Sequence, residues 1–419
     1  MAEDSEGKTG LIEIPASEIL DKIKKGEHVE YDHVRVVGDL DISKLELPIC
    51  ENNRKIVISN IKLIMCSFKG TSNFQFINFE KQVDLSGTQF EENVSFSGSR
   101  FNGTATFNKS RFIGKAVFCA SHFEGDAEFR QSHFEGEANF MGSHFQRDTY
   151  FALSQFKKDA IFKGSQFEGL NLFNNSKFSG KTTFSVSHFN KDVDFSQSHF
   201  KGGANFIGTR FSGNILFTES HYEGNLDFTG THFEGLADFR GSKFKGETIF
   251  MGSHFGREAN FKGSQFEENA YFSSDFEGST NFIESQFKGK ITFHGSHFKG
   301  DADFSQSQFK QDADLSGSNF EESANFIDSQ FKGKTTFREF FKGDAFFNKA
   351  NFEKEANFSG SHFGKLAVFS ESSFKEDAIF VASLFDGPAN FDESQFKGKT
   401  IFYWLIQRTC SLQRISFRG

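Results

Sequence analysis

The chain has 419 residues, with 63 phenylalanines, 39 glycines, three prolines and one tryptophan. Average globular composition has far less phenylalanine and more proline, so this bias indicates internal repeats. The formal net charge of −9 comes from 47 basic and 56 acidic residues, and it weighs against direct nucleic-acid binding, which needs a basic face.

The cysteines and the N-terminal sequence predict a cellular location. Cys50, Cys66, Cys119 and Cys410 lie far apart and form no CxxC pair, so neither a disulfide framework nor a zinc knuckle is predicted. The N-terminal sequence lacks the basic and apolar regions of a secretion signal. No stretch approaches the ~20 apolar residues that span a bilayer. We therefore expect a soluble, cytoplasmic protein.

The first 65 residues differ from those that follow. Residues 1–12 are acidic and polar and are predicted to be disordered. Ser17 is placed to cap a short helix, "SEILDKIKKG", that Gly26 would end. Residues 33–47 and 54–68 are rich in Val, Ile and Leu and predict irregular first coils around a loop near residues 48–53. Residues 13–65 are thus expected to form an N-terminal cap, with the helix covering the first coil.

From Phe68 to Phe402, phenylalanines recur at alternating steps of five and six residues, which gives a period of eleven. Two places before each phenylalanine stands Ser in one half-repeat, as at Ser121, and a small or β-branched residue in the other, as at Ala127. These pairs share one face of an extended chain, so they point inward and the polar residues between them point outward. Helical spacing is absent. Residues 66–403 therefore predict a continuous array of very short strands.

Glycines after the Ser-type phenylalanines are expected to permit tight turns through unusual backbone angles. Examples are Gly125, Gly136, Gly169 and Gly202. The array is interrupted at residues 272–276 and 337–341, where successive phenylalanines are only four residues apart. We interpret each interruption as a tolerated corner deletion; a kink or a partner-docking site is the alternative. In the second, Glu339 replaces Ser and Phe340 is expected to be exposed.

The S-x-F-x-x-x and A-x-F-x-x units resemble those of pentapeptide-repeat proteins, whose consensus is A-(D/N)-(L/F)-x-x. "ANF", "ADF" and "AEF" at residues 138–140, 302–304 and 127–129 carry the resemblance. The sixth residue in every second unit departs from the consensus and suggests one wider corner per pair, as in long Phe-centred archaeal and bacterial arrays. The resemblance implies an all-β fold: a right-handed quadrilateral parallel β-helix, or solenoid, of about 15 coils with a short N-terminal capping helix.

Residues 404–419 leave the repeat pattern and contain the single tryptophan, Trp404, together with Arg408, Arg414 and Arg418. They are expected to form either a C-terminal cap or a truncated extension. Both interpretations stay open at this point.

Histidines are the strongest candidates for chemistry in the array, because residues 22 apart should stack on successive coils. One predicted row contains His122, His144, His188, His232, His254, His297 and His362, and the opposite row contains His133, His199 and His221. Stacked imidazoles could chelate a metal, but other residue types fill the same position elsewhere. An exposed polar ladder is therefore favoured, as for Gln265, Gln286, Gln308 and Gln330, where side-chain hydrogen bonds along the row are expected.

No catalytic, cofactor-binding or metal-ligating residue is predicted. The inward serines have no exposed histidine partner and should bond to nearby backbone groups instead. The favoured function is a non-enzymatic structural or protein-interaction scaffold, with a protein as partner and oligomerisation through the solenoid ends possible. Two alternatives remain: a DNA-mimic regulator of a topoisomerase such as gyrase, and the repeat segment of a longer membrane-associated protein. An enzyme on a β-helix is disfavoured because no cleft with clustered carboxylates is expected.

Overall fold

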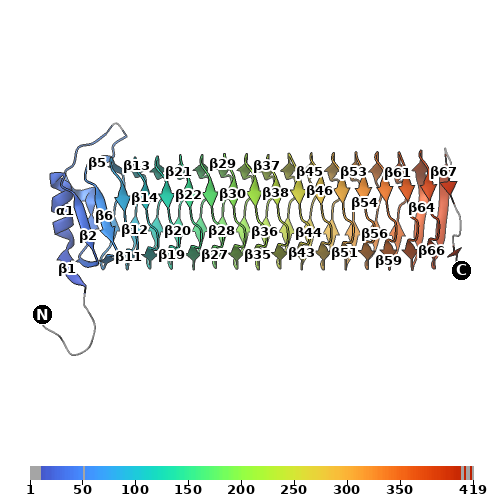
Figure 1. Cartoon of the computed structure of the whole chain (residues 1–419), viewed down its shortest axis with the longest axis horizontal. Coiled ribbons are helices and arrows are strands. Elements are labelled where there is room, and N and C mark those ends of the chain that lie inside the picture. Colours follow the sequence, from blue (N-terminus) through green and yellow to red (C-terminus); the bar gives the residue numbers. More distant parts are fainter. Residues whose placement is uncertain (1–10, 51, 407–409, 412–415, 418–419) are drawn as a thin grey trace, which may run out of the picture. The chain divides into compact units, whose positions relative to one another are not determined.

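A computed structural model describes residues 11–50, 52–406, 410–411 and 416–417. It contains two compact units, Met1–Lys181 and Thr182–Gly419, here called unit 1 and unit 2. The predicted array over residues 66–403 crosses this division, for which the repeat pattern gives no signal. Each unit is a parallel β-solenoid (Figure 1).

A regular coil has four strands of two residues each. In unit 1, one such coil consists of β15 (Arg111–Phe112), β16 (Ala116–Val117), β17 (His122–Phe123) and β18 (Ala127–Glu128). We call the walls to which these four strands belong faces 1 to 4, in that order, and use the same names for the equivalent walls of unit 2. Faces 1 and 3 hold the Ser-type half-repeats, and faces 2 and 4 hold the Ala-type half-repeats.

Strands pair in parallel with the strand four positions later in the chain. β15 pairs with β19 (His133–Phe134), which places Phe112 opposite Phe134. Their rings stack with centroids 4.7 Å apart and planes 5° from parallel. Phenylalanines of faces 2 and 4 stack in the same way along their own faces, and those of face 2 also meet those of face 4 edge to face, as Phe107 and Phe118 do at 5.4 Å and 86°. Every regular coil thus contributes four buried rings to a continuous aromatic core, and both ring geometries are favourable for aromatic pairs.

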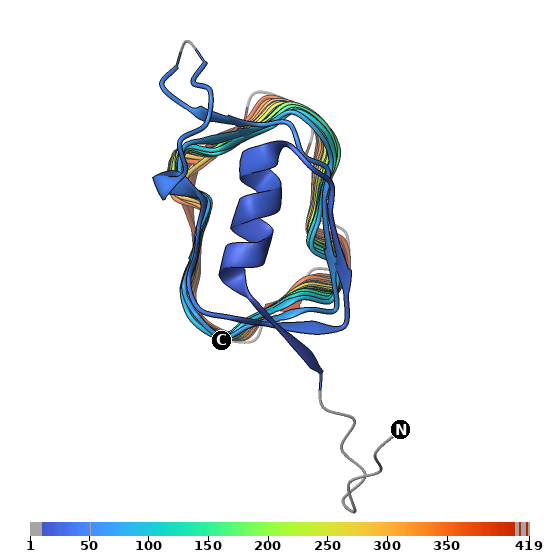
Figure 2. The same cartoon turned by 90° about the vertical axis from the view of Figure 1, so that its left-hand side faces the viewer.

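The N-terminal segment forms the beginning of unit 1. Its elements are β1 (Ile12–Pro15), α1 (Ala16–Lys25), β2 (Val29–Asp32), β3 (Val34–Val37), β4 (Leu40–Asp41), the 3₁₀ helix η1 (Ile42–Lys44), β5 (Lys55–Val57) and β6 (Ile61–Ile64). Helix α1 lies across the end of the first coil (Figure 2) and buries Ala16, Ile19 and Ile23. Gly26 ends the helix with a φ of 71°, as predicted.

Two details of the N-terminal prediction are wrong. Pro15, and not Ser17, precedes the helix, and no side chain caps it; proline suits this place because its fixed φ is compatible with a helix start. Ile12 belongs to β1, which pairs with β3, so the predicted disorder does not extend to residue 12. Residues 1–10 lie outside the described residues.

The two units together make about 18 turns, against about 15 from the repeat count. The difference arises at the two ends of the array. Strands β1 to β6 pair in register with the repeats that follow, as β3 does with β7 (Ser67–Phe68). In unit 2, β67 (Thr400–Ile406), β68 (Cys410–Ser411) and β69 (Ser416–Phe417) continue the faces of the preceding coil. Most of the predicted cap or extension at residues 404–419 lies outside the described residues.

The glycines that follow the Ser-type phenylalanines were expected to adopt unusual backbone angles, and this expectation is wrong. Gly125, Gly136 and Gly169 do not have a positive φ; that conformation occurs instead at the second residue after each Ala-type phenylalanine, where Ala120 and Gln131 adopt it as glycines do elsewhere. A Cβ atom on Gly125 would lie 2.5 Å from the carbonyl carbon of Gly103 on the preceding coil. These glycines are therefore required by the close approach of stacked corners and not by their backbone angles.

The two interruptions leave the stacking intact. Around the first one, in unit 2, Phe276 stacks on both Phe255 and Phe298 with centroids 4.8 Å apart. No described residue in 272–276 or 337–341 has a positive φ. Each interruption therefore lacks the residue that adopts the left-handed conformation in other corners between faces 2 and 3. This continuity supports the corner-deletion interpretation.

Candidate functional site

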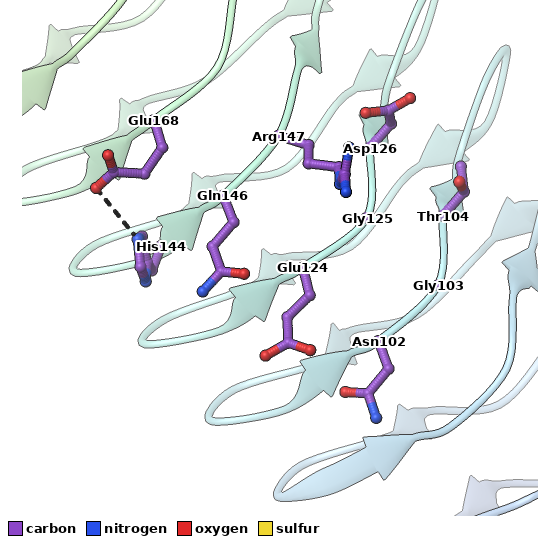
Figure 3. A pocket seen from close by; sticks show the side chains of 10 residues that line it. All are labelled: Asn102, Gly103, Thr104, Glu124, Gly125, Asp126, His144, Gln146, Arg147 and Glu168. Atoms are coloured by element: carbon purple, nitrogen blue, oxygen red, sulfur yellow. Dashed lines mark ion pairs between the residues drawn. The ribbon is translucent and has the colours of Figure 1, made fainter.

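A broad hollow with a volume of about 980 Å³ lies in unit 1 at the wide corner between faces 3 and 4. It opens broadly to solvent across consecutive coils (Figure 3). Gly103 and Gly125 line it with backbone alone, because glycine has no side chain. The other lining residues are Asn102, Thr104, Glu124, Asp126, His144, Gln146, Arg147 and Glu168.

Two carboxylates of this corner lie beside basic side chains. The carboxylate of Glu124 forms an ion pair with Arg100, and Glu168 Oε1 lies 3.4 Å from His144 Nε2. Burial, followed by the positive charge of Arg54, lowers the pKa of the adjacent His122, so this imidazole is predominantly neutral at pH 7. Acid–base catalysis needs groups poised around a bound substrate. This corner instead spreads its charged side chains along a wall that is open to solvent.

The histidine rows form as predicted within each unit. His122 lies opposite His144 on face 3 of unit 1, and their ring centroids are 5.8 Å apart. In unit 2, the corresponding distances are 6.0 Å for His232 and His254 and 6.2 Å for His199 and His221. The register also places His188, His297 and His362 on face 3 and His133 on face 1.

Carboxylates on the following coil bind several of these imidazoles, a contact that the predicted rows do not include. Nε2 of His199 lies 3.0 Å from Glu223, and Nε2 of His297 lies 2.6 Å from Glu321. His362 has the same contact with Asp386 at 2.7 Å. Arg111 and Glu135 repeat the arrangement in unit 1. The signal was present in the sequence as a basic residue before one Ser-type phenylalanine and an acidic residue after the next one on the same face, 24 positions later.

Metal binding finds no support in this arrangement. Within the described ranges, no group of three or more His, Cys, Asp or Glu side chains could hold a metal ion. Each stacked pair offers two imidazoles and, at most, carboxylates that already accept hydrogen bonds from the row. Structural zinc sites use four ligands at about 2.0–2.3 Å, so the rows lack the required ligand number.

The predicted register of the glutamine row is confirmed, but the predicted hydrogen bonds along the row are wrong. Gln265, Gln286, Gln308 and Gln330 lie opposite one another on successive strands of face 1 in unit 2. No hydrogen bond joins their side-chain amides in the part of the chain that the structure describes. The row is therefore an array of amide groups open to solvent.

The inward serines bond to the backbone, as predicted. The hydroxyl of Ser132 donates to the carbonyl oxygen of Phe107 on the preceding coil at 2.7 Å, and that of Ser143 donates to Phe118 at 2.6 Å. Both serines are at most 1% exposed. A buried hydroxyl that is bonded to a carbonyl cannot reach a substrate, so the serines hold the fold together.

Aspartate and asparagine have two structural roles at the corners. Before an Ala-type phenylalanine, Asp194 accepts a hydrogen bond from the backbone N–H of Ser196 at 2.8 Å, which is an Asx turn. At the wide corner, Asn214 accepts the N–H of Leu236 on the next coil at 3.0 Å. The D/N position of the repeat is thus explained by turn closure and not by chemistry at a site.

The family model for pentapeptide repeats (9 copies) matches residues 65–111, 85–133, 129–174, 173–221, 228–274 and 273–308. The chain belongs to the pentapeptide-repeat family. No match was found among curated proteins or among solved structures. The pentapeptide repeats account for the aromatic core, the inward serines and the Asx turns described above, which are positions inside the wall. The outward positions are free to vary, and any specific role must therefore be sought there.

Helix α1, at the start of unit 1, has ten residues. Neither it nor any other helix in the described residues is both long enough and apolar enough to cross a bilayer.

Proposed function

We propose that this pentapeptide-repeat chain is a non-enzymatic scaffold that binds a protein partner through its outer faces. The observation that carries the proposal is the uniformity of those faces: side chains repeat from strand to strand in fixed register, as Gln286, Gln308 and Gln330 do in unit 2. Repeat proteins commonly bind partners along such extended surfaces. Rigid rows lose little conformational entropy on binding, which favours association with another ordered surface.

The pairing of charges weighs against the DNA-mimic alternative. Residues 68–403 contain 43 acidic and 35 basic residues, and many of them form ion pairs between adjacent coils. Lys288 and Glu267 lie 2.6 Å apart, and Lys354 and Glu376 lie 2.7 Å apart. A surface that imitates the DNA backbone needs an unbroken negative potential. A supercoiling assay with gyrase in which micromolar protein inhibits the enzyme would revive this alternative.

We further propose a cytoplasmic location. Cys50, Cys66 and Cys119 are free thiols, and burial raises the pKa of the Cys66 and Cys119 thiols. A raised pKa lowers the thiolate fraction and the reactivity of the group. Unpaired, unreactive cysteines fit a reducing compartment. Fractionation of cells that produce the protein tests this part.

The experiment that tests the scaffold function is affinity capture with the purified chain, followed by nuclease treatment and competition with excess untagged protein. Two double variants reverse charge on different faces of unit 2: Lys310→Glu with Lys332→Glu on face 1, and Arg210→Glu with Lys299→Glu on face 3. We expect one protein to be retained, to be displaced by competitor and to be lost with only one variant. The proposal would be contradicted if the captured protein were lost after nuclease treatment. It would also be contradicted if no captured protein were displaced by the untagged chain.

A further inference from the structure

One segment of unit 1 departs from the repeats. The described residues of the loop between η1 and β5, 48–50 and 52–54, project from the wall beside the first coils (Figures 1 and 2). An antiparallel bridge joins Ile49 and Lys55 at its base. Arg54 Nε donates to the carbonyl oxygen of Gly98 at 2.6 Å, and Lys55 Nζ donates to that of Leu45 at 2.7 Å. These bonds fix the loop against the coils.

A hollow of about 320 Å³ lies between this loop and the neighbouring corner. Ligand sites generally measure ~300–1,000 Å³, so the hollow has room for a small molecule or for one unit of a larger one. Its lining combines one aromatic ring with polar side chains: Ser43, Asn52, Asn53, Lys55, Gln75 and Phe76.

Phe76 supplies the apolar wall and is an aromatic residue at the left-handed corner position. It occupies the left-handed corner position with a φ of 55°, which bulky side chains rarely adopt, and 57% of its surface is exposed. A Cβ atom on Gly98, the equivalent residue of the next coil, would lie 2.7 Å from Cδ1 of the ring. The ring is thus seated against a glycine while much of it faces solvent.

The polar groups of the hollow are neutral or already engaged. Gln75 Nε2 donates to Ser95 Oγ at 2.9 Å, which leaves its carbonyl oxygen as an acceptor. The side-chain amides of Asn52 and Asn53 have no partner among the described residues, so each offers both donors and an acceptor. Lys55 is held by the backbone, and none of the six lining residues is a carboxylate.

We propose that this hollow binds the ring of a neutral sugar. A pyranose has one face of C–H groups, which can lie on the Phe76 ring, and a rim of hydroxyls, which both donate and accept hydrogen bonds as the three amides do. A fully apolar ligand would bury those amides without hydrogen-bond partners, which opposes its binding. An anionic ligand would find a single ammonium group that is already bonded to carbonyls. The inference is independent of the proposed scaffold function.

Saturation-transfer NMR of the full chain with D-glucose, D-galactose and N-acetylglucosamine tests the proposal. We expect a saturable signal at millimolar concentration for at least one sugar, lost in Phe76→Ala and weakened several-fold in Asn52→Ala. Leu153→Ala is the matched control, because Leu153 is also an exposed apolar residue in a left-handed corner position of unit 1. This variant should give the same saturation-transfer signal as the parent chain.

Three results would overturn the proposal. These are the absence of a saturable signal with any of the sugars, a signal that Phe76→Ala and Asn52→Ala both retain, and binding of N-acetylphenylalanine amide in preference to every sugar. The last result would identify the hollow as a site for an aromatic peptide side chain. If Phe76→Ala fails to fold, Asn52→Ala alone decides, because its side chain makes no described contact within the fold.

Discussion

The inward serine is the residue that joins one coil to the next. In unit 2, Ser329 Oγ donates to the carbonyl oxygen of Phe304 at 2.8 Å. The same oxygen accepts the backbone N–H of Ser307 at 3.2 Å. The Phe304 carbonyl oxygen therefore accepts one hydrogen bond within its own coil and one from the next coil. Replacement of the serine by alanine would leave the turn intact and remove only the contact between coils.

We predict that Ser329→Ala lowers the free energy of unfolding by about 1 kcal/mol, the usual net contribution of one hydrogen bond. Urea denaturation followed by circular dichroism measures this. Ser359→Ala is the control, because the half-exposed Ser359 hydroxyl makes no described hydrogen bond, and it should change stability by less than about 0.5 kcal/mol. Equal effects of the two variants would mean that the inward hydroxyl has no special role.

Glu339 occupies the same inward position at the second interruption, and it cannot make the serine bond. It is 3% exposed, and neither carboxyl oxygen has a partner with good hydrogen-bond geometry among the described residues, although the backbone of Ser318 partly favours the charged form. Burial raises the pKa of Glu339 well above its usual range. Because the folded state favours the neutral form, the full stability is present below the pKa of the unfolded chain. It is lost progressively as the pH rises from there toward the folded-state pKa.

We therefore predict that Glu339→Ser stabilises unit 2, by roughly 1–3 kcal/mol at pH 7. The gain should be smaller at pH 4 and should increase with pH. Thermal melting across this range measures the dependence. The matched control is Glu371→Ser, which removes a carboxylate that is 53% exposed and should leave the profile nearly unchanged. A gain that does not vary with pH would contradict a neutral buried carboxyl.

Corners are the elements in which glycine matters for two different reasons. Gly125 lies under the backbone of the preceding coil, where a Cβ atom would come 2.6 Å from the nitrogen of Thr104. Gly142 has a φ of 65°, and a Cβ atom added to it would meet nothing within 4 Å. Gly125 is therefore required by packing against the neighbouring coil. Gly142 is favoured only by its left-handed conformation, which several other residue types also adopt at equivalent positions.

We predict that Gly125→Ala destabilises unit 1 by more than about 2 kcal/mol, because the stacked backbones must separate. Gly142→Ala should cost about 1 kcal/mol, the usual penalty for a left-handed alanine. Melting temperatures of the two variants give the comparison. If backbone angles, and not the approach of neighbouring coils, explained the glycine at position 125, Gly142→Ala would be the more destabilising of the two variants.

The short strands and their register were predictable because the signal repeats many times. Phe112 and Phe134 stand 22 residues apart in the sequence and lie opposite each other in the fold. The role of Gly125 was not predictable, because the approach of the Gly103 backbone depends on contacts between coils. The loop near residues 48–53 was predicted from the sequence, but the hollow that it lines together with Phe76 depends on side-chain placement that the repeat pattern does not contain.

At the scale of the whole molecule, the contacts that stabilise each unit run between neighbouring coils. Strand β17 pairs only with β13 (Arg100–Phe101) and β21 (His144–Phe145) among the described strands. Stability in such proteins is a sum of local and nearest-neighbour contributions. A defect in one coil should therefore weaken the coils next to it and leave distant ones unaffected.

Hydrogen exchange measured by mass spectrometry on Gly125→Ala tests this locality. We predict faster exchange in peptides that cover residues 100–150, because opening of the damaged corner exposes the amides of the adjacent coils. Peptides from residues 300–350 in unit 2 should exchange as in the parent chain. Glu339→Ser provides the reciprocal case, with slower exchange near residues 318–362 and no change in unit 1. A uniform change across both units in either variant would show that the chain unfolds as one cooperative body and would contradict nearest-neighbour stability.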